Sequence, residues 1–272
     1  MVSASARREQ ARYAMSRGLG ARAACALVGT PRSALGYEAR LPARDEPLRA
    51  RVRQLAQRHR RYGYRRIAAL LRREGEVVNV KRVHRIWQRE GLALARRRPR
   101  RRLPKRGPVM PNHEGAPNVV WACDFVHDGC ANGEILRCLT LIDEGTRECI
   151  ALSVEASQSA RRVIATLEQA IKEYGQPRFL RTDNGPEFIA EALEEWTKKH
   201  GIAHTFNEPG KPWQNGKNES FNGRFRDECL NMERFMSCRE ARVIISQWRE
   251  EYNEERPHSG INYSTPSEKR LA

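Results

Sequence analysis

The chain has 272 residues, a formal net charge of +17 and seven cysteines. No apolar run is long enough for a transmembrane helix, and the amino terminus lacks the apolar core of a signal peptide. The cysteines show neither CxxC nor zinc-finger spacing, so we expect them to be reduced. The hydropathy predicts no membrane partner, and the length predicts one catalytic domain with a smaller domain beside it.

Charge is unevenly distributed along the chain. Residues 1–110 hold 30 Lys and Arg against 7 Asp and Glu, whereas residues 111–272 hold 20 against 26. A cationic part joined to a mildly acidic part suggests a polyanion-binding module attached to a catalytic domain. Arg outnumbers Lys 28 to 2 in the first part, so a compositional bias of the genome explains part of the excess. It does not explain why the excess stops near residue 106.

The first 95 residues are predicted to be helical. Residues 5–37 read as two or three short helices with a turn at Gly29, which is the length of a helix-turn-helix, and we assign 1–40 to this segment. The prolines of 41–47 predict a linker. Apolar residues at helical spacing then predict a three-helix unit with Arg on most of its outward positions. Because these arginines could contact phosphates, we assign 41–95 as a basic DNA-binding domain. Its candidate phosphate contacts are Arg65, Arg66, Lys81, Arg82 and Arg85. The alternative is a solvated basic face.

A basic linker, 96–114, separates this region from a β-rich one. Its run of Arg with prolines cannot form a core and should be extended. In 115–272 the alternation of apolar residues predicts three strands, a helix, and a fourth strand that ends at Asp183. A helix over 187–200, a fifth strand over 202–206 and further helices follow.

Three acidic residues stand out in this second part. Asp124 lies within an apolar, β-prone run, where a carboxylate is unfavourable unless it is paired or binds a cation. Asp183 follows a buried strand at a turn, and Glu219 falls on the early turns of a helix. Two Asp on strands and one Glu on a helix form an all-oxygen ligand set, which suits Mg²⁺ or Mn²⁺. Glu187 is the rival third ligand if Glu219 points away.

Several motifs carry a family resemblance. They are Trp121-x-x-Asp124, Thr182-Asp-Asn-Gly-Pro-Glu-Phe188, Lys211-Pro-Trp-Gln-Asn-Gly with Glu219-Ser-Phe-Asn-Gly223, Tyr62-Gly-Tyr-Arg-Arg-Ile67, and Tyr252-Asn-x-x-Arg-Pro-His258. Together they resemble the second-frame (OrfB-type) transposases of bacterial insertion sequences, which belong to the retroviral-integrase-like Asp-Asp-Glu superfamily. The likeness spans nearly the whole chain.

The resemblance implies a fold, a reaction and partners. The fold would be α/β, a ribonuclease-H-like mixed five-stranded sheet flanked by helices, preceded by a small all-α helix-turn-helix-like DNA-binding region. Asp124, Asp183 and Glu219 would hold two Mg²⁺ or Mn²⁺ ions for cleavage and strand transfer of DNA. The partners would be double-stranded DNA of the element ends and target, further copies of the chain, and an upstream-frame protein or fusion. The location would be the bacterial cytoplasm, at the nucleoid.

Residues around Glu219 are further candidates for DNA contact. They are Lys217, Asn218, Asn222 and Arg224. The resemblance implies at least one apolar residue at the two positions before the Glu in many relatives, whereas this chain has Lys217 and Asn218. Two other functions stay open at this point: a ribonuclease-H-like nuclease that cuts without joining, and a DNA-binding regulator without catalytic activity.

Overall fold

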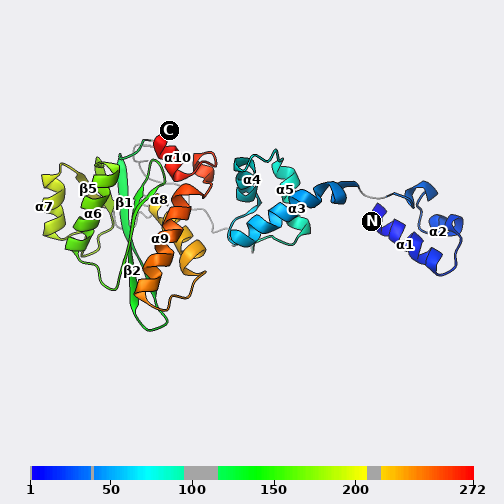
Figure 1. The fold of residues 1–272 in the computed structure, drawn as a ribbon, viewed down its shortest axis with the longest axis horizontal. Helices are drawn as coiled ribbons and strands as arrows, with labels where there is room; N and C mark the ends of the chain where they lie inside the picture. The colour runs from blue at the N-terminus through cyan, green and yellow to red at the C-terminus, as the bar shows by residue number, and fades with distance from the viewer. Residues whose placement is uncertain (1, 38–39, 95–115, 207–215) are drawn as a thin grey trace. The chain divides into compact units, whose positions relative to one another are not determined.

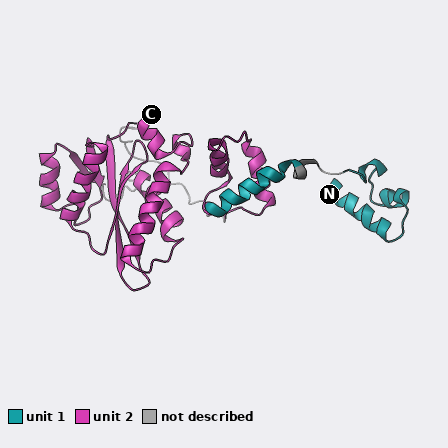
Figure 2. Ribbon diagram, in the orientation of Figure 1, with its two compact units in different colours: residues 1–58 teal, residues 59–272 magenta. Residues whose placement is uncertain are grey.

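The computed structural model describes residues 2–37, 40–94, 116–206 and 216–272, and the side chains of 40–43 are not described. The linker predicted at 96–114 therefore lies outside the described residues. The chain divides into two compact units, 1–58 and 59–272 (Figure 2). The larger unit contains all three candidate catalytic acids.

The first unit is helical, as the sequence predicts. It contains α1 (Ala4–Ser16), α2 (Ala21–Leu27), a 3-10 turn η1 (Arg32–Ala34) and α3 (Arg40–Arg58). The predicted linker at 41–47 is wrong, because α3 runs through this segment with Pro47 inside it. Proline removes one backbone donor and disfavours a helix interior. The same helix buries Leu48, Val52 and Leu55, and burying these side chains offsets the loss.

The second unit begins with two short helices. These are α4 (Tyr64–Arg73) and α5 (Val80–Arg89). Gly75 follows α4 with φ +88°, a conformation that favours glycine, and the Asn79 side chain accepts a hydrogen bond from the Lys81 N–H at 2.8 Å to start α5. Ile67, Leu71 and Val83 are fully buried, so the helical spacing of the sequence is confirmed here.

A five-stranded mixed sheet forms the centre of the second unit (Figure 1). Its order is β3-β2-β1-β4-β5, with β1 antiparallel to β2, β2 antiparallel to β3, and β4 parallel to both β1 and β5. This is the ribonuclease-H-like arrangement that the sequence predicts. The strands are β1 (Val120–Gly129), β2 (Ile135–Asp143), β3 (Cys149–Glu155), β4 (Phe179–Thr182) and β5 (Ala203–Phe206).

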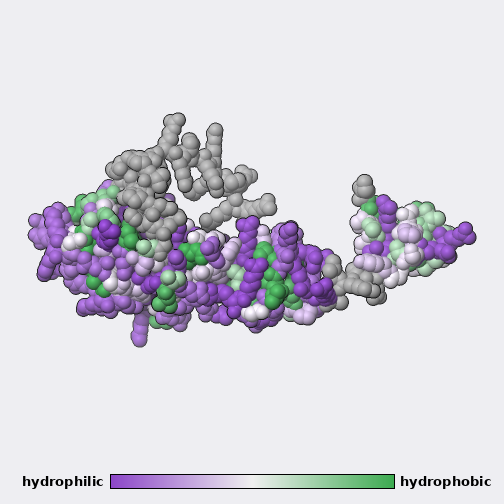
Figure 3. All heavy atoms as spheres, turned by 90° about the horizontal axis from the view of Figure 1, so that it is seen from above, coloured by the Kyte–Doolittle hydropathy of each residue, from purple (hydrophilic) through white to green (hydrophobic). Residues whose placement is uncertain are grey.

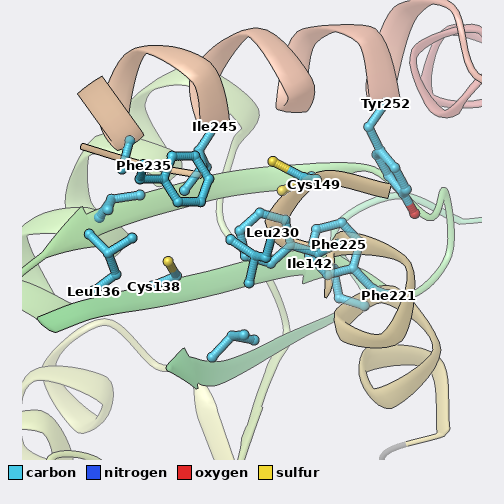
Figure 4. Packing of buried hydrophobic residues seen from close by; sticks show 14 of the residues in the cluster. Leu136, Cys138, Ile142, Cys149, Phe221, Phe225, Leu230, Phe235, Ile245 and Tyr252 are labelled. Atoms are coloured by element: carbon cyan, nitrogen blue, oxygen red, sulfur yellow. The ribbon is translucent and has the colours of Figure 1, made fainter. Parts of the chain in front are cut away.

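Helices cover both faces of the sheet (Figure 1). One face packs against α6 (Ala160–Tyr174) and α7 (Glu191–Lys199). The other packs against α8 (Gly216–Phe225), the π-helical η3 (Arg226–Leu230) and α9 (Cys238–Glu254), through the apolar cluster of Figure 4. The chain ends with η4 (Ser259–Ile261) and α10 (Pro266–Leu271).

The helix predicted over 187–200 begins later than expected. Residues 186–189 form turns, and α7 starts only at Glu191. The N–H groups of Phe188 and Ile189 both bond to the Gly185 carbonyl, at 2.9 and 3.1 Å. Ala190 is extended and separates this turn from α7. The prediction that Glu187 lies in the first turn of a helix is therefore wrong.

A buried ion pair connects the start of this unit with its end. Arg256 is 1% exposed and donates to both carboxylate oxygens of Glu228, at 2.5 and 2.7 Å. Arg66, in the first turn of α4, donates to the same carboxylate at 3.3 Å. Burial, followed by the charges of Arg256, Arg224 and Arg66, lowers the pKa of His258 to about 2, so this imidazole is neutral. Two motifs far apart in sequence, 62–67 and 252–258, therefore meet at Glu228.

Replacing Arg256 with Met should leave Glu228 as a buried carboxylate with less charge compensation. We expect the free energy of unfolding to fall by about 3–5 kcal/mol, measured by urea denaturation. The double variant Glu228→Leu/Arg256→Met should lose less than the sum of the two single variants. Additive losses would show that the two side chains do not stabilise each other.

Candidate active site

Asp124 occupies the central strand of the sheet. It lies on β1, opposite Thr140 of β2, and is partly buried. Its Oδ1 accepts the Phe125 N–H at 2.8 Å, and its Oδ2 accepts the Asn222 side-chain amide at 2.8 Å. The Thr140 hydroxyl donates to the Asp124 carbonyl at 3.1 Å and is 3.2 Å from the Asn222 amide oxygen. Thr140 and Asn222 thus position the carboxylate.

Asp183 is placed beside Asp124 by strand register. The parallel pairing of β1 with β4 sets Ala122 opposite Arg181. Asp124 follows two residues later on β1, and Asp183 two residues later, directly after the end of β4. Neighbouring strands are about 4.8 Å apart, and residues two apart share a face. Asp183 Oδ1 accepts the Gly185 N–H at 3.0 Å, so the residue also closes its own turn. A Cβ at Gly185 would lie 3.1 Å from that oxygen, so a side chain there would crowd it.

Glu219 comes from the other side of the site. It lies in the first turn of α8, and Asn222 follows three residues later on the same helix face. Because Asn222 bonds Asp124, this face lies over β1. Burial, together with the charges of Asp183 and Glu219 and against the lowering effect of the two hydrogen bonds, raises the pKa of Asp124 to about 6. Asp183 and Glu219 therefore both act electrostatically on Asp124.

The donor set fits a hard divalent cation. Partial burial and two negative neighbours make ionised Asp124 unfavourable, and a cation would relieve this repulsion. The ligand atoms of the three acids do not all lie within 4.8 Å of one another. Among the described residues, a group of three metal-ligand atoms that close occurs only at His59, Glu251 and Glu255. Metal binding at the triad would therefore draw the carboxylates closer together.

Glu187, the rival third ligand, has a different partner. Its Oε1 lies 2.7 Å from Arg137 Nη2 of β2, and the Arg137 guanidinium lies 4.4 Å from the centre of the Phe125 ring. The Phe125 ring in turn stacks on Phe188 at 5.0 Å. This contact set holds the turn after Asp183 against the sheet. Glu187 is neutralised by an arginine, which favours Glu219 as the third acid.

Comparison with known proteins identifies the family. Two models of the integrase core domain match residues 114–212 and 200–266, and a model of an HTH-like domain matches 43–101. The 31.7 kDa protein of insertion element IS407 from Burkholderia multivorans is 45% identical over 252 residues, covering 91% of this chain and 89% of that protein. The 39.2 kDa protein of IS476 from Xanthomonas euvesicatoria is 42% identical over 251 residues, covering 92% and 72%.

The chain belongs to the transposase family of bacterial insertion elements. The resemblance read from the sequence is thereby confirmed, and so is the fold class. Among solved structures, the catalytic core domain of HTLV-2 integrase in complex with magnesium is 19% identical, with a TM-score of 0.45, covering 58% of this chain and 99% of that one.

The five basic residues predicted to contact DNA before the transposase core differ in their surroundings. Arg65 and Lys81 are exposed, whereas Arg82 and Arg85 are partly buried. Arg66 is engaged with Glu228, and its guanidinium lies 5.2 Å from the centre of the Tyr62 ring.

Hydrophilic side chains predominate on the face shown in Figure 3, with hydrophobic ones scattered among them. In the described part of the chain, no helix is both long and apolar enough to cross a membrane.

Three of the four candidates on α8 make hydrogen bonds within the protein. Lys217 donates to the Glu144 carbonyl at 3.1 Å, and Arg224 donates to the Ser220 carbonyl at 3.2 Å. Burial lowers the pKa of Arg224. Asn222 donates its side-chain amide to the Asp124 carboxylate. Their contact with DNA stays a prediction.

Asn218 occupies an interior position. It is fully buried, and neither atom of its amide has a hydrogen-bond partner among the described residues. Its burial agrees with the expectation, drawn from the family resemblance, of an apolar residue before the Glu. An unpaired buried amide is unfavourable by about 1–3 kcal/mol.

The sequence does not predict two supporting residues of the site, Thr140 and Arg137, or the bond from Asn222 to Asp124. All three features depend on which strands and helices pack together. One signal was available for Asn222, because its spacing of three from Glu219 places both side chains on one helix face. Nothing local in the sequence pairs Arg137 with Glu187.

The bond from Asn222 makes a testable prediction about Asp124 in the metal-free protein. Asn222→Leu removes a donor that favours the ionised carboxylate, so the pKa of Asp124 should rise above its value of about 6. Carbon-13 NMR of the carboxyl groups against pH measures it, with Ser220→Ala on the same helix as control. An unchanged or lower pKa in Asn222→Leu would show that the amide does not stabilise the carboxylate.

The raised pKa of Asp124 in the wild-type protein also determines how this carboxyl changes the free energy of unfolding with pH. The folded pKa of Asp124 exceeds the ordinary value of 3.8, so the folded state binds this proton more tightly. The stabilising contribution of this carboxyl is therefore present below pH 3.8 and is lost as pH rises through about 6.

Proposed function

We propose that this transposase cleaves DNA at the ends of its insertion element and joins them to target DNA, using Mg²⁺ or Mn²⁺ held by Asp124, Asp183 and Glu219. The observation that carries the proposal is that Asp183, which directly follows β4, and Glu219 of α8 both act electrostatically on Asp124 of the central strand. On the family resemblance, two ions are proposed, which these three acids would hold. When bound, such cations stabilise the attacking and leaving oxygens of a phosphodiester.

The reaction is two successive phosphoryl transfers. In the first, water forms a bond to phosphorus, the bond to the 3′ oxygen breaks, and that oxygen takes a proton to become a 3′-OH. In the second, this hydroxyl loses its proton and forms a bond to a target phosphorus, the bond from that phosphorus to the target 3′ oxygen breaks, and the leaving oxygen takes up a proton. No bond forms between DNA and the protein. Asn222 and Thr140 hold Asp124 in place, and the contact of Glu187 with Arg137 steadies the turn that presents Asp183.

Changing Asp183 to Asn should lower strand-transfer activity by about 100-fold or more, because the variant lacks one charged ligand. Asp124→Asn and Glu219→Gln should behave alike. Manganese binding to the full chain, followed by calorimetry, should weaken in parallel. The matched control is Glu191→Gln, which removes a carboxylate from the first turn of α7.

Full joining activity in Asp183→Asn would remove the residue from the catalytic set. Cleavage without joining in the wild-type protein would favour the nuclease alternative. Loss of activity in Glu187→Gln together with full activity in Glu219→Gln would make Glu187 the third ligand.

We further propose that the active transposase is a homo-oligomer on DNA, because two element ends must be held together while each triad acts on one strand position. Light scattering on the complex with two end duplexes should report at least two chains. A monomer on DNA with full joining activity would refute this. The same measurement with the upstream-frame protein added tests whether that protein joins the complex.

A further inference from the structure

A cavity outside the catalytic triad lies between α4 and the turn after η4. It has a volume of about 430 Å³. Its lining comes from three places in the second unit: the exposed side of α4, the start of α5, and the tail turn. The lining residues are Arg65, Ala69, Arg72, Arg73, Val80, Asn262 and Tyr263. This volume is in the range of small-ligand sites.

The charged groups of the lining are all cationic. Three arginines line the cavity, and no acidic side chain is among the lining residues. Arg72 is fixed by two bonds from its guanidinium to the Val78 carbonyl, at 3.2 and 3.1 Å, and Arg73 by Glu268 at 2.7 Å. Arg65 is exposed, and its Nε donates to the Tyr64 hydroxyl at 3.2 Å. A guanidinium has five N–H donors, so these bonds use only part of its capacity.

The aromatic part of the lining is held in an unusual backbone conformation. Asn262 and Tyr263 have φ of +56° and +63° in succession, and positive φ is rare for a bulky residue such as tyrosine. Hydrogen bonds fix this turn: the Tyr263 N–H donates to the His258 carbonyl at 2.9 Å, and the His258 N–H to the Ser264 carbonyl at 3.1 Å. Strained backbone that is held this firmly clusters at binding sites.

The chemistry of the cavity matches one nucleotide. Guanidinium groups bind phosphodiester oxygens, and an aromatic ring provides a surface on which a base can stack. Ala69 and Val80 add apolar surface that suits a base. A base in a paired duplex is not free to stack in this way, so the ligand would be an unpaired nucleotide.

We propose that this cavity binds one unpaired nucleotide of a DNA strand, with its phosphate on Arg65 and its base against Tyr263. The inference rests on the proposed function in that DNA is the substrate. It adds a contact between the DNA strand and the carboxyl-terminal turn, which lies outside the acidic triad.

The test measures binding of the full-length protein to two labelled DNAs by fluorescence anisotropy. One is a blunt duplex of the element end, and the other has the same sequence with a three-nucleotide single-stranded overhang. Tyr263→Asn removes the ring and places there a residue that tolerates positive φ, so the fold is retained. Tyr263→Phe keeps the ring. Arg65→Gln removes the exposed charge, and Arg161→Gln, an exposed position on α6, is the matched control.

We expect Tyr263→Asn to weaken binding of the overhang DNA by about tenfold or more, with a smaller effect on the blunt duplex. Tyr263→Phe and Arg161→Gln should bind like the wild type. Arg65→Gln should weaken binding and reduce the slope of log affinity against log salt by about 0.7–0.9. Thermal unfolding of each variant shows whether the fold is retained.

Wild-type affinity of both Tyr263→Asn and Arg65→Gln for the overhang DNA would overturn the inference, and joining by the wild-type protein would then leave the proposed function standing. Equal loss on blunt and overhang DNA would also overturn it, because the site would then not select an unpaired base. Overhang binding that depends on Tyr263, in a protein that never joins DNA, would support the inference and contradict the proposed function.

Discussion

The placement of a carboxylate on the central strand constrains the rest of the catalytic unit. Asp124 lies between two neighbouring strands and under α8, where burial and two negative neighbours raise its pKa to about 6. An ionised group in such a place requires hydrogen bonds and a compensating charge. The Phe125 N–H and the Asn222 amide supply the first, and a bound cation would supply the second. The parallel register of β4 and the packing of α8 bring the other two acids to the same place.

A second interaction joins α4 to the segment that follows α8. Glu228, in the π-helical segment that continues α8, binds Arg256 and Arg66. Helix α8 also carries Glu219, so the helix that supplies the third acid continues into a segment fixed by a buried ion pair. Ion pairs of this kind specify which parts meet, while the apolar cluster of Figure 4 supplies most of the favourable burial.

Much of the fold could be predicted from sequence, and the three candidate acids could be proposed from it, for local reasons. Alternating apolar residues predict β1 to β3, and Asp124 is conspicuous as the acid in such a run. The two predictions of secondary structure that were wrong, a linker before residue 48 and a helix that begins at Glu187, also have physical causes. Pro47 lies inside a helix because the apolar residues after it are buried, and Glu187 precedes α7 because Ala190 is extended. The partners of Asn222 and Glu187 could not be predicted, since each bond joins segments that only the folded chain brings together.

Anomalous diffraction from crystals of the full chain soaked in Mn²⁺ tests the central claim most directly. We expect a manganese peak bound by Asp124 and Asp183, with a Glu219 oxygen about 2.1 Å from the same ion or from a second one. A peak that Glu187 binds in place of Glu219 would contradict it. So would manganese found only at His59, Glu251 and Glu255, where ligand atoms already lie within 4.8 Å of one another.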